Sequence, residues 1–310
     1  MTLYLPIADV TLSLWLLLGI GTAVGFVSGL FGIGGGFLMT PLLILLGIPP
    51  AVAVGTGALP ILASSLSGTM AQYRRGNVDT TLGAVLIAGG LAGAAIGVET
   101  VAGLRHLGQF DVTVSLAYVI LLSLIAALML VENLALLRRR GAHPEPSGPR
   151  RKSEHVWLHR LPLKMRFRAS KLYVSALPVA VIGAFVGFLM AAIGFGGGLI
   201  VVPALIYLLR VPASFAIGTS LFQATFVSAA TAILHAYSNH TLDAPLGVVL
   251  VCGVVLGAQL GASAGPQLKG WHLRVSLAVL VMMVALRVGY DLFIEPSEPY
   301  TVQTLIRGLQ

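Results

Sequence analysis

A glycine-rich element occurs twice in this chain, with its two copies 162 residues apart. The copies are Gly32–Pro41 (GIGGGFLMTP) and Gly194–Pro203 (GFGGGLIVVP), and strongly apolar runs flank both. Three adjacent glycines cannot hold a lipid-facing helix together. Backbone inside a bilayer must satisfy its hydrogen bonds, so a break there is tolerated only around a cavity lined by protein or water. Two breaks at matching positions of two repeats predict the substrate site of a transporter.

The composition of the chain indicates an integral membrane protein. Hydrophobic residues make up 57% of the sequence and charged residues only 10%, whereas a soluble domain carries about 25% charged residues. The apolar runs lack the alternation of barrel strands, so we expect an all-α polytopic protein whose first run is a retained span. The single cysteine, Cys252, lies in an apolar run, which excludes an intramolecular disulfide.

The apolar runs divide into two sets of five. Most runs reach the roughly 20 residues that cross a bilayer. The segments 35–48 and 197–210 are shorter, and each begins at a glycine triplet and ends near proline. We therefore expect short helices there that span half the membrane or are strongly displaced. The predicted organisation is a first repeat at 11–136, a basic linker at 137–172, a second repeat at 173–294 and a tail at 295–310.

The two halves also match outside the glycine triplets. A proline follows each triplet, at Pro41 and Pro203, and a Gly-Thr pair comes later, at Gly55–Thr56 and Gly218–Thr219. Further along, each half carries glycines at every fourth position: Gly89, Gly93, Gly97, Gly253, Gly257 and Gly261. This spacing leaves one helix face bare, so another helix can approach closely.

Positive charge is concentrated between the two halves. Residues 138–171 hold 11 of the 19 Lys and Arg residues and carry a local net charge of +9, while the rest of the chain is near neutral. In a membrane protein this pattern favours a cytoplasmic loop over a nucleic-acid-binding segment. The remaining charges favour five crossings in each half. An odd number of crossings makes the repeats inverted and places both termini outside.

The backbone after each triplet is the first candidate for ligand binding. It opens a helix whose first N–H groups are unpaired and whose dipole end is positive, which suits an anion. The alternative is a tight turn between packed helices, but the duplication favours binding. The predicted substrate-binding residues are Gly34, Gly35, Gly36, Thr56, Gly196, Gly197, Gly198, Thr219 and Gln223. The hydroxyl groups among them could instead bond their own or a neighbouring helix.

Few ionisable residues lie inside the predicted spans. Glu99 is the candidate for proton coupling, because an intramembrane carboxylate can relay protons. We expect Glu132 and His235, which lie near helix ends, to face water. Arg287 and Asp291 are four residues apart, a spacing that permits an intrahelical ion pair. No catalytic motif or metal-ligand cluster is present in the sequence, so we expect neither an enzyme nor a cofactor.

These motifs resemble those of the sulfite exporter TauE/SafE family of membrane proteins. The residues that carry the resemblance are Gly29–Gly36 with Pro41, Val54–Thr56, Gln72–Asp79, Gly194–Pro203 and Ile217–Thr219. The resemblance extends over roughly 12–136 and 173–294. It implies a bacterial inner-membrane transporter that exports sulfur-containing oxyanions, such as sulfite or organosulfonates.

The leading hypothesis from the sequence is alternating access, with an anion held between the two glycine turns near mid-membrane. Coupling would be to protons or to the membrane potential. A passive anion channel with the same pore is one alternative. A second is a non-transporting scaffold whose basic linker recruits partners or anionic lipid heads. The expected partners are a small anion, the lipid bilayer and a coupling proton, with no nucleic acid.

Overall fold

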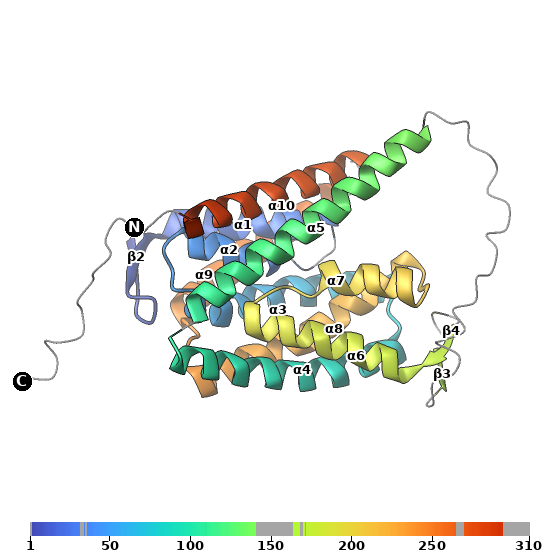
Figure 1. Ribbon diagram of the computed structural model, residues 1–310, viewed down its shortest axis with the longest axis horizontal. Helices are drawn as coiled ribbons and strands as arrows, with labels where there is room; N and C mark the ends of the chain where they lie inside the picture. Colours follow the sequence, from blue (N-terminus) through green and yellow to red (C-terminus); the bar gives the residue numbers. More distant parts are fainter. Residues whose placement is uncertain are drawn as a thin grey trace, which may run out of the picture.

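The computed structural model describes residues 2–31, 34, 36–108, 110–140, 164–167, 170, 172–264 and 270–293. Gly35, most of the predicted linker and the predicted tail lie outside these ranges. The described residues form helices and two short hairpins (Figure 1). The long helices are α1 (Leu14–Phe31), α3 (Pro50–Arg74), α4 (Thr80–His106), α5 (Phe110–Arg140), α6 (Ala176–Ile193), α8 (Ala213–Leu234), α9 (Ala244–Ala264) and α10 (Gly270–Phe293).

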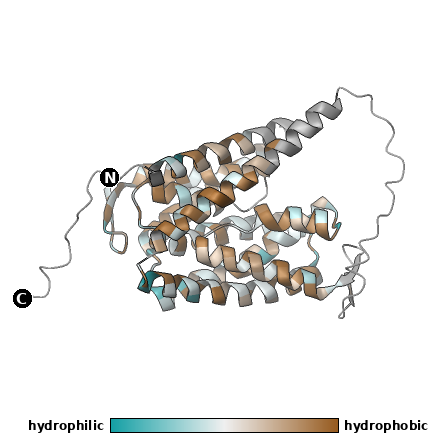
Figure 2. Cartoon of the chain, in the orientation of Figure 1, coloured by the Kyte–Doolittle hydropathy of each residue, from teal (hydrophilic) through white to brown (hydrophobic). Residues whose placement is uncertain are grey.

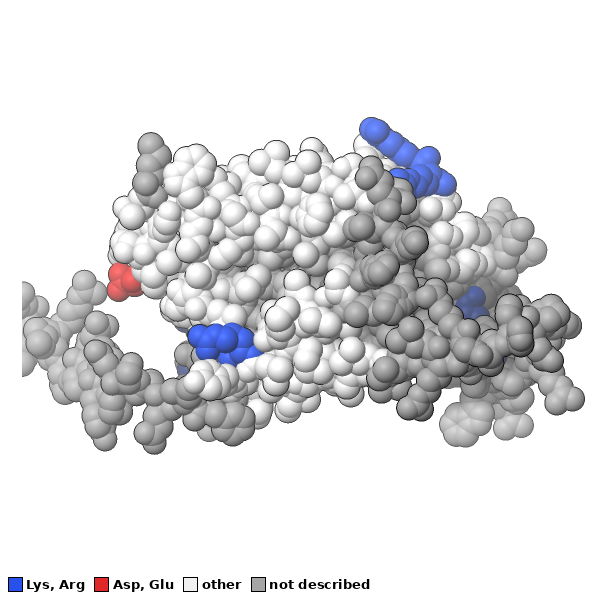
Figure 3. Space-filling model, turned by 90° about the horizontal axis from the view of Figure 1, so that it is seen from above, with Lys and Arg blue, Asp and Glu red and all other residues white. Residues whose placement is uncertain are grey.

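The helices have the length and surface of membrane spans. Six of them are long and apolar enough to cross a bilayer, namely α1, α3, α4, α6, α9 and the helix formed by α8 with its continuation to Asn239. Hydrophobic residues run along the described helices (Figure 2), and most of the described residues on the face in Figure 3 are neither acidic nor basic. The predicted all-α polytopic membrane fold is therefore confirmed.

The two repeats are inverted, because their equivalent helices α3 and α8 run antiparallel. Thr56, near the start of α3, contacts Thr241, which follows α8. Thr219, near the start of α8, contacts Asp79, which follows α3. The predicted inversion is thus a property of the packing.

The remaining long helices pair across the repeats. Helix α1 packs along α9, and α6 packs along α4, each pair running parallel. A Cβ atom at Gly93 would overlap the Ala184 carbonyl, and one at Gly257 would overlap the Thr22 carbonyl. The glycines at every fourth position therefore let one backbone lie directly against another, as predicted. Helices α5 and α10 form the outer pair, seen crossing the top of Figure 1.

A short β-hairpin precedes the first helix of each repeat. Strands β1 (Thr2–Leu5) and β2 (Val10–Ser13) lead into α1, while β3 (Lys164–Phe167) and β4 (Leu172–Ser175) lead into α6. The two hairpins lie at opposite ends of the bundle (Figure 1). The sequence predicts neither hairpin, since it assigns residues 11–13 to a span and β3 to the linker.

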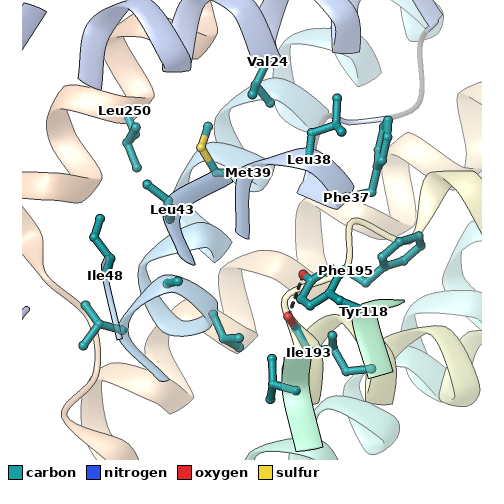
Figure 4. Packing of buried hydrophobic residues seen from close by; sticks show 14 of the residues in the cluster. Val24, Phe37, Leu38, Met39, Leu43, Ile48, Tyr118, Ile193, Phe195 and Leu250 are labelled. Carbon is teal, nitrogen blue, oxygen red and sulfur yellow. Dashed lines mark hydrogen bonds between the residues drawn. The ribbon is translucent and has the colours of Figure 1, made fainter. Parts of the chain in front are cut away.

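The two short helices begin at the glycine triplets, as predicted. Helix α2 (Gly36–Leu45) has 10 residues, about 15 Å of helix, which is half of a hydrocarbon core of about 30 Å. Helix α7 (Gly198–Pro203) continues as the π-helix η1 (Ala204–Leu208). Apolar side chains of α2 pack into the main core with residues of α1, α5 and α9 (Figure 4).

Candidate functional site

Both glycine elements contain backbone that favours glycine. Gly34 has φ of 74° and Gly194 has φ of 78°, in the left-handed region that residues with a Cβ atom rarely adopt. In the second element, the turn ends α6 and allows α7 to begin four residues later. The triplets therefore break two transmembrane helices and start two short ones.

The two glycine elements touch one another. A Cβ atom at Gly196 would lie 2.8 Å from the carbonyl oxygen of Gly34 and 2.9 Å from the amide nitrogen of Gly36. The rings of Phe37 and Phe195, which flank the contact, have centroids 6.4 Å apart (Figure 4). Only glycine backbone permits this approach. The elements that the sequence places 162 residues apart thus lie in direct contact.

This contact lies near the middle of the membrane-spanning bundle. Ile61 is packed against Gly36, and Ser65 lies beside Gly34. Both residues belong to the central part of α3, a helix of 25 residues. The glycine contact therefore lies beside the middle of α3, away from both ends of that helix.

The broken end of α6 is capped by side chains from other helices. The last carbonyls of a helix lack intrahelical donors, and in a membrane such groups require another partner. Here the partners come from three different elements. The carbonyl oxygens of Ala191, Ile193 and Gly194 accept hydrogen bonds from His235 Nε2 (2.9 Å), the Tyr118 hydroxyl (2.7 Å; Figure 4) and the Thr40 hydroxyl (3.2 Å).

His235 is buried in this cap, so the prediction that it faces water is wrong. Its side chain is 0% exposed, and it begins the π-helix η2 (His235–Asn239). The Asn239 amide donates to Nδ1 at 3.1 Å, while Nε2 donates to the Ala191 carbonyl. The ring therefore holds its proton on Nε2. Helices α4 and α6 cover this end of α8, which its position in the sequence does not reveal. The side chain of Glu132 lies outside the described residues.

Gln223 is the polar residue with the most unusual environment. Its side chain is 0% exposed, and neither its amide oxygen nor its amide nitrogen has a hydrogen-bond partner. The Nε2 atom lies beside Gly90 of α4. Thr231, two turns along α8, also has a buried hydroxyl without a partner. An unmet buried group costs about 1–3 kcal/mol, so such groups in a native fold are met by a ligand, an ion or a buried water, or have a functional reason.

Thr56 and Thr219 lie at the two ends of the bundle. The Thr56 hydroxyl accepts a hydrogen bond from the Asp243 amide at 2.9 Å, and the Thr219 hydroxyl accepts one from the Asp79 amide at 3.1 Å. Both hydroxyls thus connect one repeat to the other. Contact between these threonines and an anion stays a prediction.

Glu99 lies on α4 at a surface groove rather than beside the glycine turns. The groove has a volume of about 520 Å³ and lies between α4 and the end of α8. Its lining residues are Ala95, Ile96, Val98, Glu99, Thr100, Leu234 and Ser238. Proton coupling through Glu99 stays a prediction. The predicted ion pair of Arg287 involves Asp291, whose side chain lies outside the described residues. Among the residues that the structure describes, no three His, Cys, Asp or Glu side chains form a potential metal site.

Comparison with known proteins places this arrangement in a family context. Residues 17–288 match the model of the family described as "Sulfite exporter TauE/SafE". A "Probable membrane transporter protein" of Xylella fastidiosa (strain 9a5c) is 31% identical over 252 residues, covering 80% of this chain and 84% of that protein. The "Probable membrane transporter protein YjnA" of Bacillus subtilis (strain 168) is 29% identical over 271 residues, covering 86% and 96%. No solved structure matches the chain.

Proposed function

Because the chain belongs to the sulfite exporter TauE/SafE family of membrane transporters, we propose that it exports a small sulfur-containing oxyanion by alternating access. Sulfite and organosulfonates are the proposed substrate class. The proposed location is the inner membrane of a bacterium, with the basic linker in the cytoplasm and both termini outside.

The observation that carries this proposal is the contact between the two glycine elements. Gly196 of one repeat lies against Gly34 and Gly36 of the other, next to the centre of α3. The first N–H groups of α2 and of α7 with η1 start at this contact. In this closed arrangement the Gly36 N–H donates to the Gly34 carbonyl and the Ile200 N–H donates to the Gly197 carbonyl. The positive dipole end of each helix still attracts an anion, and it does so more strongly where water is excluded. Once the two turns separate, glycine lets a ligand reach the backbone.

Gln223 is the proposed side-chain ligand. Its unpaired amide nitrogen can donate to an oxyanion and its unpaired oxygen can accept from a protonated one. A neutral amide also avoids the cost of burying a second charge. In this proposal, Thr56 and Thr219 contribute to the binding site indirectly, by holding the loops at Asp243 and Asp79. Glu99 or the membrane potential couples transport to a source of energy.

Alternating access accounts for the closed contact better than an open pore does. The two glycine turns are packed against one another and against Ile61, so an anion can pass only after they separate. Such separations take microseconds to milliseconds, which limits turnover. A passive channel with the same site would instead carry more than about 10⁶ ions per second.

The proposal is tested by transport of labelled sulfite and of an organosulfonate into liposomes that contain the purified protein. Gly196→Ala places a methyl group against the backbone of Gly34 and Gly36, so we expect transport to fall by at least about a hundredfold. Gly103→Ala is the matched control, because no atom lies within 4 Å of the added methyl group. Equal transport by the two variants would remove the glycine contact from the mechanism.

A further inference from the structure

Two buried aspartates begin equivalent helices of the two repeats. Asp79 precedes α4 and is 2% exposed, and Asp243 precedes α9 and is 0% exposed. Asp79 Oδ1 accepts hydrogen bonds from the amides of Thr81 and Leu82 at 3.1 Å. Asp243 Oδ1 accepts one from the amide of Leu246 at 3.2 Å. One carboxylate oxygen of each aspartate therefore caps its own helix.

The second carboxylate oxygen of each aspartate binds a hairpin of the other repeat. Asp79 Oδ2 accepts from the amide and the hydroxyl of Ser170, at 2.9 and 2.7 Å. Asp243 Oδ2 accepts from the amides of Ile7 and Ala8, at 3.0 and 3.4 Å. These donors lie in the turns of the hairpins that lead into α6 and α1. Hydrogen bonds to a carboxylate are stronger than those between neutral groups.

The repeated Gly-Thr pair completes each arrangement. The Asp79 amide donates to Thr219 and the Asp243 amide donates to Thr56. A Cβ atom at Gly218 would overlap the Asn77 carbonyl, and one at Gly55 would crowd Thr241. Each pair thus forms a socket for the loop of the other repeat. We call the two arrangements the Asp79 latch (Asp79, Ser170, Thr219) and the Asp243 latch (Asp243, Ile7, Ala8, Thr56).

The latches lie on opposite sides of the glycine contact. The Asp243 latch holds α3 at Thr56, and the Asp79 latch lies beyond its end at Arg74. The stretch of α3 between Thr56 and Arg74 is about 27 Å long, close to the thickness of a hydrocarbon core. Ile61 and Ser65, which touch the glycine turns, lie between these points. The hairpins that the latches hold lie at opposite ends of Figure 1.

We propose that the two latches are the alternating gates of the transporter, so that Asp79 and Asp243 set which side of the membrane reaches the glycine turns. The inference rests on the alternating access proposed above. When one latch opens, its hairpin and the helix that follows leave the socket, while the other latch stays closed. When a latch opens at the membrane surface, water replaces the hairpin groups that donate hydrogen bonds to its carboxylate. The open and closed states of the latch are therefore close in free energy. With both latches closed, this structure is the occluded state.

The test substitutes asparagine for each aspartate. Asparagine keeps a side-chain oxygen that caps the helix, but its NH₂ group cannot accept the hydrogen bonds of the hairpin. In Asp243→Asn we expect amide exchange in residues 2–13 to rise by about tenfold to a hundredfold, with residues 164–175 unchanged. Asp79→Asn should give the opposite pattern. Unchanged exchange in both hairpins would overturn the proposal.

The gating role is read from access to the centre of the protein. Ser65→Cys places a thiol beside Gly34, in a Cys252→Ala background that removes the native cysteine. A membrane-impermeant thiol reagent should react from one face only in Asp243→Asn and from the other face only in Asp79→Asn. In the parent, which carries Ser65→Cys and Cys252→Ala alone, the thiol should react at least about tenfold more slowly than in either aspartate variant. Reaction from both faces or from neither, with faster hairpin exchange, would make the latches structural ties and overturn the proposal.

A milder variant guards against loss of folding. Ser170→Ala removes the hydroxyl donor to Asp79 but keeps the amide donor. It should change the same hairpin exchange and the same reagent access as Asp79→Asn, to a smaller extent, and no change would count against the latch. Neither measurement uses a substrate. Failure to transport sulfite would therefore contradict the proposed function, while failure of sided access would contradict the gates alone.

Discussion

Helices α3 and α8 occupy equivalent places in the two repeats, yet only part of their chemistry is shared. Both carry, near their start, a Gly-Thr pair whose hydroxyl accepts a hydrogen bond from the amide of an aspartate in the other repeat. Both also pack against the glycine contact, through Ile61 and Ser65 on α3 and Leu221 on α8. The shared features hold the two repeats together in opposite orientations.

The differences lie on one face of α8. Gln223, Thr231 and His235 are buried and polar there, and the first two have side-chain atoms without partners. The equivalent positions of α3 carry other residues, namely Pro60, Gly68 and Gln72. Helix α3 also buries polar side chains, Ser64, Ser65 and Thr69, but each of these has a hydrogen-bond partner. Of the two helices, as far as the structure describes them, only α8 thus buries polar side-chain atoms without a partner. We infer that the shared Gly-Thr pairs serve structure and gating, whereas the asymmetric residues of α8 add side-chain ligands to the anion site proposed at the glycine turns.

The strongest challenge to this inference is Gln223→Met. The apolar side chain has a similar shape but no donor or acceptor, so we expect transport to fall by about tenfold to a hundredfold. The free energy of unfolding should stay the same or rise, because two unpaired polar atoms leave the core. Liposome transport and denaturant unfolding in detergent measure the two effects. Phe226→Leu, on the exposed side of α8, is the control that should change neither.

The symmetric half of the comparison is tested by Gly93→Ala and Gly257→Ala. Each adds a methyl group against the backbone of a parallel helix, Ala184 in one case and Thr22 in the other. We expect each to lower the free energy of unfolding by about 1–3 kcal/mol. Gly103→Ala should instead raise it by about 0.5–1 kcal/mol, since its site is open. Strongly unequal losses of unfolding free energy at Gly93 and Gly257 would show that the two repeats do not pack alike.

Much of the frame is predictable because its signals are local. Hydropathy and segment length predict the membrane helices, and glycine at every fourth position predicts the close packing that Gly93 and Gly257 make. The charge of the loops predicts the inversion that α3 and α8 show. Each pattern follows from a requirement that acts on a single helix, which must either face lipid or let another helix pack closely against it.

The hairpins and latches are not predictable in the same way. Strands of four residues carry little periodicity, and the latch contacts join residues 91 and 235 positions apart. The Gly-Thr pair signals a close approach but does not say which loop approaches. His235 shows the same limit, since its place near a helix end suggests exposure to water while helices α4 and α6 bury it. The donors for a buried group come from the fold, not from neighbours in sequence.

Thr56→Val and Thr219→Val compare the two sockets directly. Valine keeps the shape of threonine but leaves the amide of Asp243 or Asp79 without its acceptor. We expect each change to lower the free energy of unfolding by about 1–2 kcal/mol. Denaturant unfolding checks this expectation, with Thr100→Val as the control because that hydroxyl bonds only within its own exposed turn. If only one of the two variants loses unfolding free energy, the two latches differ in how strongly they stabilise the closed structure.

The smallest expected effect comes from His235→Gln, which gives α8 the residue that α3 has at Gln72. The glutamine amide can still donate to the Ala191 carbonyl, so the cap on α6 remains. We expect a loss in the free energy of unfolding of about 1 kcal/mol or less, whereas His235→Leu leaves that carbonyl without a donor and should lower it by about 1–3 kcal/mol. Transport measured against pH gives the second readout. If His235 only caps α6, His235→Gln keeps the parent's pH profile; a changed profile would add His235 to the groups that move protons and widen the asymmetry between the two helices.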